Sequence, residues 1–282
     1  MLYLHIANSQ TYQPYSYDPD FSYESGWDKY ALKYATLLKE GSLYNLHKVV
    51  MYGYIDRNIL PAFNKPKLEI LDVNCGTGND FPYLLTLGNV TGIDGSAGML
   101  NKAAETYSDA VHTGTLKLYD GMLEQMQEDS FGGKKFDIIY SITGGFSYID
   151  DNEFQRVFSV LKTMLKPGGV IVAAHLNTFC LSETLVCLLK GRFMRSIVRL
   201  KKTIPNADGS FMYLRSKRKL ETLLTPLFDG IVTVPLIVLT PPYQTDMNLS
   251  AKTVEKFRKL ENQIIAKKRG ISIADQIITV CR

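Results

Sequence analysis

The sequence lacks the features that would place the chain outside the ordinary class of globular proteins. No apolar run approaches the roughly 20 residues that a membrane-spanning helix needs. The first ten residues do not combine basic residues with a following apolar run, which argues against a signal peptide. Internal repeats and low-complexity tracts are absent. With 282 residues, 45% apolar and 21% charged, we expect a cytoplasmic protein with one large domain and an insertion.

Cysteine and histidine are scarce, and their spacing does not indicate a metal site. Only four cysteines occur, without a CxxC pair, and Cys180 and Cys187 lie seven positions apart. We therefore predict no metal and four reduced, mostly buried thiols. His5, His47 and His112 have no partner pattern. The formal net charge of +4 is too small to indicate a nucleic-acid partner by itself.

Strand and helix patterns alternate along much of the chain. Alternation of this kind implies right-handed crossovers and a mostly parallel sheet that helices cover on both faces. The predicted strands are 68–73, 89–94, 116–119, 136–142, 170–174, 231–239 and 276–281. The predicted helices are 27–39, 42–60, 81–87, 96–107, 150–165 and 249–267.

The alternation stops after Asn177 for about fifty residues, which predicts an insertion after the fifth strand. We expect an N-terminal helical cover over residues 1–66, with a Tyr-rich arm at its start. A ligand-binding core follows over residues 67–175 and a lid insertion over residues 176–228. Residues 229–282 are then expected to complete the sheet.

A glycine-rich turn between a strand and a helix is the most informative segment. Leu71-Asp-Val-Asn-Cys-Gly-Thr-Gly78 permits positive φ and a close approach of a ligand, and the next helix presents N–H groups to an anion. The following strand ends in Asp94, where an acid can accept both hydroxyls of a ribose. The dinucleotide fingerprint G-x-G-x-x-G does not fit, because Asn74 and Phe81 stand where glycine is needed.

Five segments in the right order resemble the motifs of class I S-adenosylmethionine-dependent methyltransferases of the small-molecule type. Leu71–Gly78 is similar to motif I, D-x-G-x-G-T-G, and residues 90–100 are similar to the motif of the second strand. The other three are Tyr119-Asp-Gly-Met122, Phe136-Asp-Ile-Ile139 and Leu165-Lys-Pro-Gly-Gly169. The resemblance implies a Rossmann-like, doubly wound α/β sheet of seven strands, with the last strand antiparallel.

The resemblance also implies that S-adenosylmethionine lies across the carboxyl ends of the strands, so that residues 67–175 form its binding core. Asp94 would bind the ribose, Asp120 the adenine amine, and Met122 would flank the ring. Tyr34, in the helical cover segment, would reach the cofactor or else belong to the core. The full set of expected cofactor residues is Tyr34, Asp72, Asn74, Gly76, Gly78, Asp94, Gly95, Met99, Asp120, Gly121, Met122 and Ser141.

The sequence departs from the family at two places. Asn74 replaces the first glycine of motif I; because Asn tolerates positive φ, we expect the turn to survive, with its side chain crowding the methionine end of the cofactor. A relative that binds the cofactor without methylating is therefore one alternative. The segment Tyr140–Phe146 lacks the N-P-P-Y sequence of enzymes that methylate amides or base amines, which argues against a DNA substrate.

Acceptor-side residues are expected after the fourth and fifth strands. If the acceptor is a hydroxyl or a carbon acid, a general base assists methyl transfer, and His175 is the candidate at the end of strand five. The alternative is a histidine that is simply hydrogen-bonded there. Tyr148 is a second catalytic candidate, whereas Asp150 and Asp151 are better explained as helix caps. We predict transfer to oxygen or carbon of a hydrophobic or aromatic small molecule.

The insertion carries ten Lys or Arg residues between positions 190 and 219, against one acid, Asp208. A helix there, unless Gly191 breaks it, would place an apolar stripe beside a basic one. The stripes are Leu185, Leu189, Phe193, Ile197 and Leu200, and Arg192, Arg195, Arg199 and Lys202. Three interpretations remain: a lid with solvated charges, a peripheral membrane contact through 185–202 that reaches a lipophilic acceptor, or RNA binding. RNA ranks last, because no RNA-binding module is present.

Overall fold

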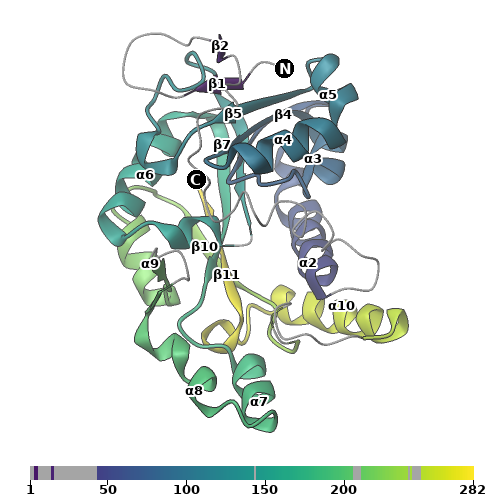
Figure 1. Ribbon diagram of the computed structural model, residues 1–282, viewed down its shortest axis with the longest axis vertical. Coiled ribbons are helices and arrows are strands. Elements are labelled where there is room, and N and C mark those ends of the chain that lie inside the picture. Colours follow the sequence, from purple (N-terminus) through teal and green to yellow (C-terminus); the bar gives the residue numbers. More distant parts are fainter. Residues whose placement is uncertain are drawn as a thin grey trace. The chain divides into compact units, whose positions relative to one another are not determined.

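The computed structural model describes residues 3–5, 14–15, 43–142, 144–205, 211–240, 242 and 249–282. The predicted helix 27–39, with Tyr34, lies outside these residues. One sheet has nine strands in the order β10-β11-β7-β6-β3-β4-β5-β1-β2, and β8 and β9 form a separate hairpin (Figure 1). The strands are β1 (Tyr3–His5), β2 (Pro14–Tyr15), β3 (Leu68–Val73), β4 (Gly88–Asp94), β5 (Leu116–Asp120), β6 (Phe136–Ser141), β7 (Leu165–Leu176), β8 (Thr203–Pro205), β9 (Phe211–Tyr213), β10 (Ile231–Leu236) and β11 (Gln276–Cys281).

The predicted helices are present where they fall within the described residues; a helix over residues 108–112 lies outside the predictions, and the insertion has a more broken pattern. The described α-helices are α2 (Leu43–Asn58), α3 (Phe81–Leu87), α4 (Ala97–Thr106), α5 (Ser108–His112), α6 (Asp151–Thr163), α7 (Leu181–Leu189), α8 (Phe193–Ser196), α9 (Lys217–Leu224) and α10 (Ala251–Ala266). The 3-10 turns are η1 (Leu60–Ala62), η2 (Leu123–Gln125), η3 (Gly145–Tyr148), η4 (Val198–Lys201) and η6 (Ile271–Ile273). No helix among the described residues is both long and apolar enough to cross a membrane.

Contacts divide the chain into two compact units. Unit 1 comprises Met1–Thr36, Lys65–Ser141 and Asn152–Ile171, and unit 2 comprises Leu37–Asn64, Ile142–Asp151 and Val172–Arg282. Strand β7 begins in unit 1 and ends in unit 2.

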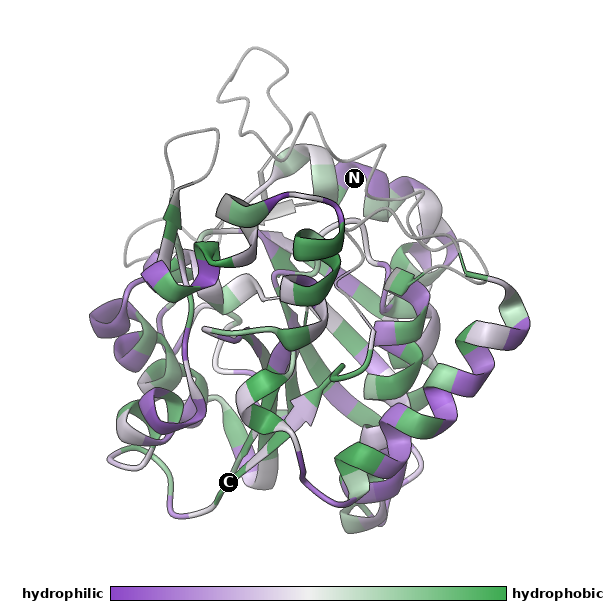
Figure 2. Cartoon of the chain, turned by 90° about the horizontal axis from the view of Figure 1, so that it is seen from below, coloured by the Kyte–Doolittle hydropathy of each residue, from purple (hydrophilic) through white to green (hydrophobic). Residues whose placement is uncertain are grey.

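Unit 1 is built on parallel strands. β3 pairs with β4 on one side and with β6 on the other, and β4 pairs with β5. All six residues of β6 are buried, as expected for a strand covered on both faces. Hydrophobic colour predominates along the strands of the sheet in Figure 2, while the helices carry hydrophilic residues along one side. The side chain of Ser96 caps α4 by accepting a hydrogen bond of 3.2 Å from the Met99 amide, as predicted.

Unit 2 contains the antiparallel end of the sheet and the insertion. β10 pairs antiparallel with β11 from Ile231–Cys281 to Leu236–Gln276, so the predicted antiparallel last strand is confirmed. A hydrogen bond of 2.9 Å from Arg57 to Asn262 joins α2 to α10.

Several predicted boundaries need correction. Two short strands, β1 and β2, extend the seven predicted strands; they contain three and two residues, too few for a periodic pattern to reveal. β7 already begins at Leu165, five residues before the predicted start. β10 ends at Leu236, because Ile237 has a φ of 61°, outside the extended region. The helix considered over 185–202 is not continuous: α7 ends at Leu189, and Gly191 has a φ of 68°.

Candidate cofactor site and acceptor-side residues

The loop between β3 and α3 has the backbone geometry that motif I requires. Asn74, Gly76 and Gly78 have φ values of 59°, 55° and 75°, all in the left-handed region. Asn is among the few residues other than Gly that adopt this region readily, so the expectation that the turn survives at Asn74 is confirmed. Left-handed residues at every second position are a feature of the concave loops that can bind anions.

Asp94, the last residue of β4, is tied to this loop. Its Oδ2 accepts a hydrogen bond of 2.8 Å from the amide of Gly76, and its Oδ1 accepts one of 3.0 Å from the amide of Ser96. A carboxylate accepts hydrogen bonds at about four positions, so this acid is of the kind that can accept from the hydroxyls of a ribose. The neighbouring strand β5 ends in a second acid, the half-buried Asp120. Asp120 lies beside Asp94, because the two residues are register partners.

Two glycines of unit 1 allow close approaches that a side chain would block. A Cβ at Gly95 would lie 2.2 Å from Sδ of Met122, and one at Gly78 would lie 2.3 Å from the ring of Phe81. Met122 itself is exposed after β5, whereas Met99 is buried in the first turn of α4. Glycine at position 95 thus lets the exposed Met122 side chain lie directly against the β4 end, beside Asp94.

Two buried polar atoms at this edge of the sheet have no hydrogen-bond partner among the described residues: Oδ1 of Asn74 and Oγ of Ser141. Asn74 follows β3 and Ser141 ends β6, and these two strands are neighbours. The strand order reverses between β3 and β6, which is the switch point where doubly wound sheets bind their ligands. Because leaving such a group unpaired costs about 1–3 kcal/mol, the pair fits a polar ligand that supplies hydrogen bonds.

Other polar residues of the loop are occupied within the protein. The Tyr140 hydroxyl donates a hydrogen bond of 2.9 Å to Oδ1 of Asp80, so Asp80 stands at the N-cap position of α3 without capping it through its side chain. Asp72 is buried in β3. Burial raises the pKa of the Cys75 thiol well above its usual value, helped by the carboxylates of Asp94 and Asp72. Cys75 therefore stays a neutral thiol.

His175, in unit 2, lies within β7 and is 1% exposed. Its Nε2 shares a hydrogen bond of 2.8 Å with Oγ1 of Thr279, and the ring of Phe146 lies 6.1 Å away. Burial, with a smaller contribution from Arg215, lowers the pKa of His175 to about 3. The geometry agrees with the alternative of a hydrogen-bonded strand residue, and the role of general base stays a prediction.

The segment after β6 is held by a buried arginine that the sequence pattern did not reveal. Arg215 is 1% exposed and donates to the carbonyls of Phe146 at 2.9 Å and Ile149 at 2.6 Å. Its Nε also donates to Asp151 at 2.9 Å. In the sequence Arg215 stands among the ten basic residues of the insertion, and only the fold shows that it points inward. Its contacts fix the turn that carries the half-buried Tyr148.

The carboxylate of Asp151 is therefore an ion-pair partner. Besides Arg215, Lys219 lies 2.7 Å from it. Burial acts to raise the pKa of Asp151, but the hydrogen bonds from Lys219 and Arg215 outweigh this and lower it. Among the described residues, no group of three His, Cys, Asp or Glu side chains is arranged to hold a metal ion.

The comparisons with known proteins agree with this geometry. Residues 70–169 match the family model of a methyltransferase domain. This region is a class I methyltransferase domain. It contains every expected cofactor residue except Tyr34, which precedes it. No curated protein has a sequence significantly similar to that of this chain.

Solved methyltransferases share the fold of nearly the whole chain. An S-adenosylmethionine-dependent methyltransferase from Clostridium acetobutylicum ATCC 824 is 14% identical, with a TM-score of 0.55, over 91% of this chain and 98% of that one. The CcbJ methyltransferase from Streptomyces caelestis is 12% identical, with a TM-score of 0.56, over 90% and 96%. A complex of DhpI with SAM and HEP is 15% identical, with a TM-score of 0.53, over 91% and 94%. At these identities the similarity concerns the fold.

Proposed function

We propose that this protein transfers the methyl group of S-adenosylmethionine to oxygen or carbon of a hydrophobic or aromatic small molecule. The observation that carries the proposal is the hydrogen bond from Gly76 to Asp94, which joins the positive-φ loop of a methyltransferase domain to the acid at the end of β4. The DhpI structure, a complex with SAM, shares this fold.

The residues of unit 1 fit the parts of this cofactor. Asp94, an acceptor at the end of β4, is proposed to bind the ribose hydroxyls, and its register partner Asp120 and the nearby Met122 are proposed to bind the adenine. The unpartnered oxygens of Asn74 and Ser141 suit the amino and carboxyl groups of the methionine end, the Ser141 hydroxyl as donor or acceptor and the Asn74 oxygen as acceptor. Gly76 and Gly78 carry no side chain at two positions of the loop, which would let a ligand approach the backbone there.

The cofactor supplies a methyl group on a positively charged sulfur that is itself a good leaving group. The protein therefore needs to align the acceptor with the methyl carbon and to exclude water, and no covalent protein nucleophile is required. The neutral thiol of Cys75 agrees with this requirement. An imidazole with a pKa of about 3 is a weak base at neutral pH, so His175 is best suited to acceptors that need little help in losing a proton.

The acceptor is proposed to be lipophilic because the insertion presents many apolar side chains to solvent. Calorimetric titration with S-adenosylmethionine and S-adenosylhomocysteine tests the first half of the proposal. We expect both to bind with roughly micromolar affinity, about −8 kcal/mol. Lack of binding by both would refute it.

Formation of S-adenosylhomocysteine tests the second half, with lipophilic phenols and quinone precursors as the first acceptors. Turnover with one of them is expected. Binding of the cofactor without turnover on any acceptor would instead favour a non-methylating relative. Turnover that requires RNA, together with RNA binding that weakens steeply with salt, would favour an RNA methyltransferase.

A further inference from the structure

Many large apolar side chains of residues 181–202 face outward. Seven of the eleven exposed large apolar residues among the described ones fall in this short segment. Leu189 is 88% exposed and Phe193 is 65% exposed. Single exposed apolar residues are ordinary, but a concentration of them marks a surface that contacts something else. The seven are Leu181, Leu185, Leu188, Leu189, Phe193, Ile197 and Leu200.

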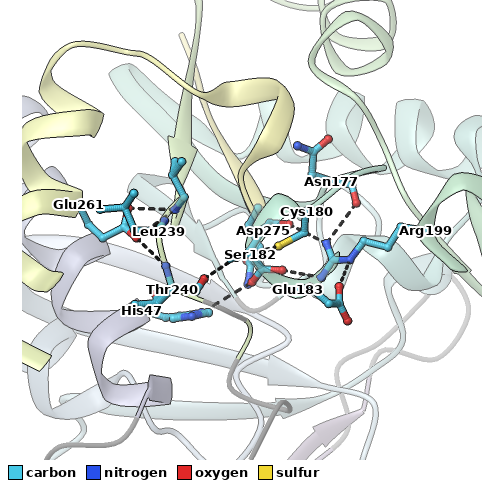
Figure 3. Close-up of polar contacts among 12 residues, drawn as sticks. His47, Asn177, Cys180, Ser182, Glu183, Arg199, Leu239, Thr240, Glu261 and Asp275 are labelled. Atoms are coloured by element: carbon cyan, nitrogen blue, oxygen red, sulfur yellow. Dashed lines mark hydrogen bonds and ion pairs between the residues drawn. The ribbon is translucent and has the colours of Figure 1, made fainter. Parts of the chain in front are cut away.

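Arg199 helps to fix this orientation, because its guanidinium group points inward and makes several ion pairs and hydrogen bonds. Its Nε donates to Glu183 at 2.5 Å and its Nη2 to Asp275 at 2.6 Å (Figure 3). Its Nη1 donates to the carbonyls of Asp275 at 2.9 Å and Asn177 at 3.2 Å. Burial acts to lower the pKa of Arg199, but the carboxylates of Asp275 and Glu183 outweigh it and raise the pKa. Turning the apolar side inward would break these contacts and leave charges buried without partners.

Further hydrogen bonds hold α7 and α8 next to each other (Figure 1). Gly191, with a φ of 68°, reverses the chain between them, and the amide of Arg192 donates to the carbonyl of Cys187 at 2.8 Å. The hydroxyl of Thr184 donates to the carbonyl of Ser196 at 3.2 Å. The exposed apolar side chains therefore project from two short helices and a 3-10 turn that unit 2 holds in place.

The exposed charges of this segment, where the structure describes them, have one sign. They are those of Lys190, Arg192, Lys201 and Lys202. The one acid of the segment, Glu183, is engaged by Arg199. A symmetric contact with a second copy of this chain would place positive charge against positive charge, which disfavours association. An anionic lipid surface complements both the apolar and the basic side chains.

We propose that residues 181–202 form a surface that docks on an anionic lipid bilayer. Leu189 and Phe193 insert between the headgroups, and the lysines and arginines contact lipid phosphates or carboxylates. The docking surface belongs to unit 2, and the inference does not depend on the reaction proposed above. It would give the protein access to lipophilic molecules dissolved in the bilayer.

Cosedimentation of the full chain with vesicles tests the proposal. We expect binding to vesicles of phosphatidylcholine with about one third phosphatidylglycerol, and much weaker binding to phosphatidylcholine alone or at high salt. Leu189→Asp with Phe193→Asp is expected to lower the affinity at least tenfold, as is Lys201→Glu with Lys202→Glu. The matched control, Lys252→Glu with Lys256→Glu, places the same charge change on α10 and is expected to bind like the wild type.

Circular dichroism and thermal melting establish that each variant folds. We expect folding to be retained, because the substituted side chains are exposed. Three results would overturn the proposal: no binding to anionic vesicles, equal binding to neutral ones, or equal binding by the control and the other variants. Sedimentation velocity adds a fourth. A dimer that Leu189→Asp with Phe193→Asp converts to a monomer would assign the surface to a second copy of the chain.

Discussion

The amide of Gly76 donates a hydrogen bond of 2.8 Å to the carboxylate of Asp94. The two residues lie 18 positions apart, one in the loop after β3 and the other at the end of β4. The bond links the carboxylate of Asp94 directly to the backbone of the positive-φ loop. A change at Asp94 should therefore affect cofactor binding both directly and through the loop.

Asp94→Asn is expected to weaken binding of S-adenosylmethionine by about 10- to 100-fold. A hydrogen bond to a charged group contributes about 1.5–3 kcal/mol, and the amide side chain keeps the shape while it loses the charge. Calorimetric titration measures the change. Glu128→Gln, an exposed carboxylate of the same unit, is the control and should leave the affinity as it is. An unchanged affinity in Asp94→Asn would remove Asp94 from the site.

Asn74→Val is expected to destabilise the protein by about 1–3 kcal/mol, because a β-branched residue is strained at a φ of 59°. Asn74→Gly removes the same side chain without this strain and is expected to keep the stability. Urea denaturation of both variants measures the difference. If the two variants were equally stable, residue 74 would not have the left-handed backbone. Cofactor affinity of Asn74→Gly then reports whether the Asn side chain assists binding or crowds the ligand.

Arg215→Met is expected to destabilise the fold by about 3–5 kcal/mol, because it leaves the carbonyls of Phe146 and Ile149 without their donor and breaks the pair with Asp151. Lys217→Met, which changes an exposed lysine two positions away, should cost well under 1 kcal/mol. Chemical denaturation compares the two. Equal effects would show that the buried guanidinium does not hold the turn after β6.

His175 is expected to make the protein sensitive to acid. Its pKa is about 3 in the folded protein against 6.5 as a model value, so the unfolded chain binds the proton first as the pH falls. Above pH 6.5 the titration of His175 leaves the free energy of unfolding unchanged. Between pH 6.5 and 3 it lowers the free energy of unfolding by about 1.4 kcal/mol per pH unit.

Denaturation of the wild type and of His175→Gln at pH 7 and pH 5 measures this loss, and the variant should lose less stability on acidification. Parallel curves would contradict the low pKa of His175. The pH profile of turnover separates this structural effect from catalysis. A general base at His175 would make His175→Gln lose activity at every pH while its stability at neutral pH stays high.

The sequence by itself determined the methyltransferase domain and the positive-φ loop that the structure describes. Local rules predict the places of Gly76, Gly78 and Asp94. A turn with positive φ favours glycine, as at the first two positions, and the acid is expected where the next strand ends. Asn74 illustrates the same point, because the backbone preference of Asn is a property of the residue alone. The antiparallel pairing of β10 and β11 came instead from the family resemblance.

Tertiary structure alone decided which basic residues of the insertion are buried. Arg199 and Arg215 look like their neighbours in the sequence, and both turn inward because carboxylates distant along the chain meet them there: Asp275 for Arg199 and Asp151 for Arg215. Seven large apolar residues between positions 181 and 202 face solvent as a consequence. A helical pattern predicts that two faces exist, but only long-range ion pairs determine which face points outward.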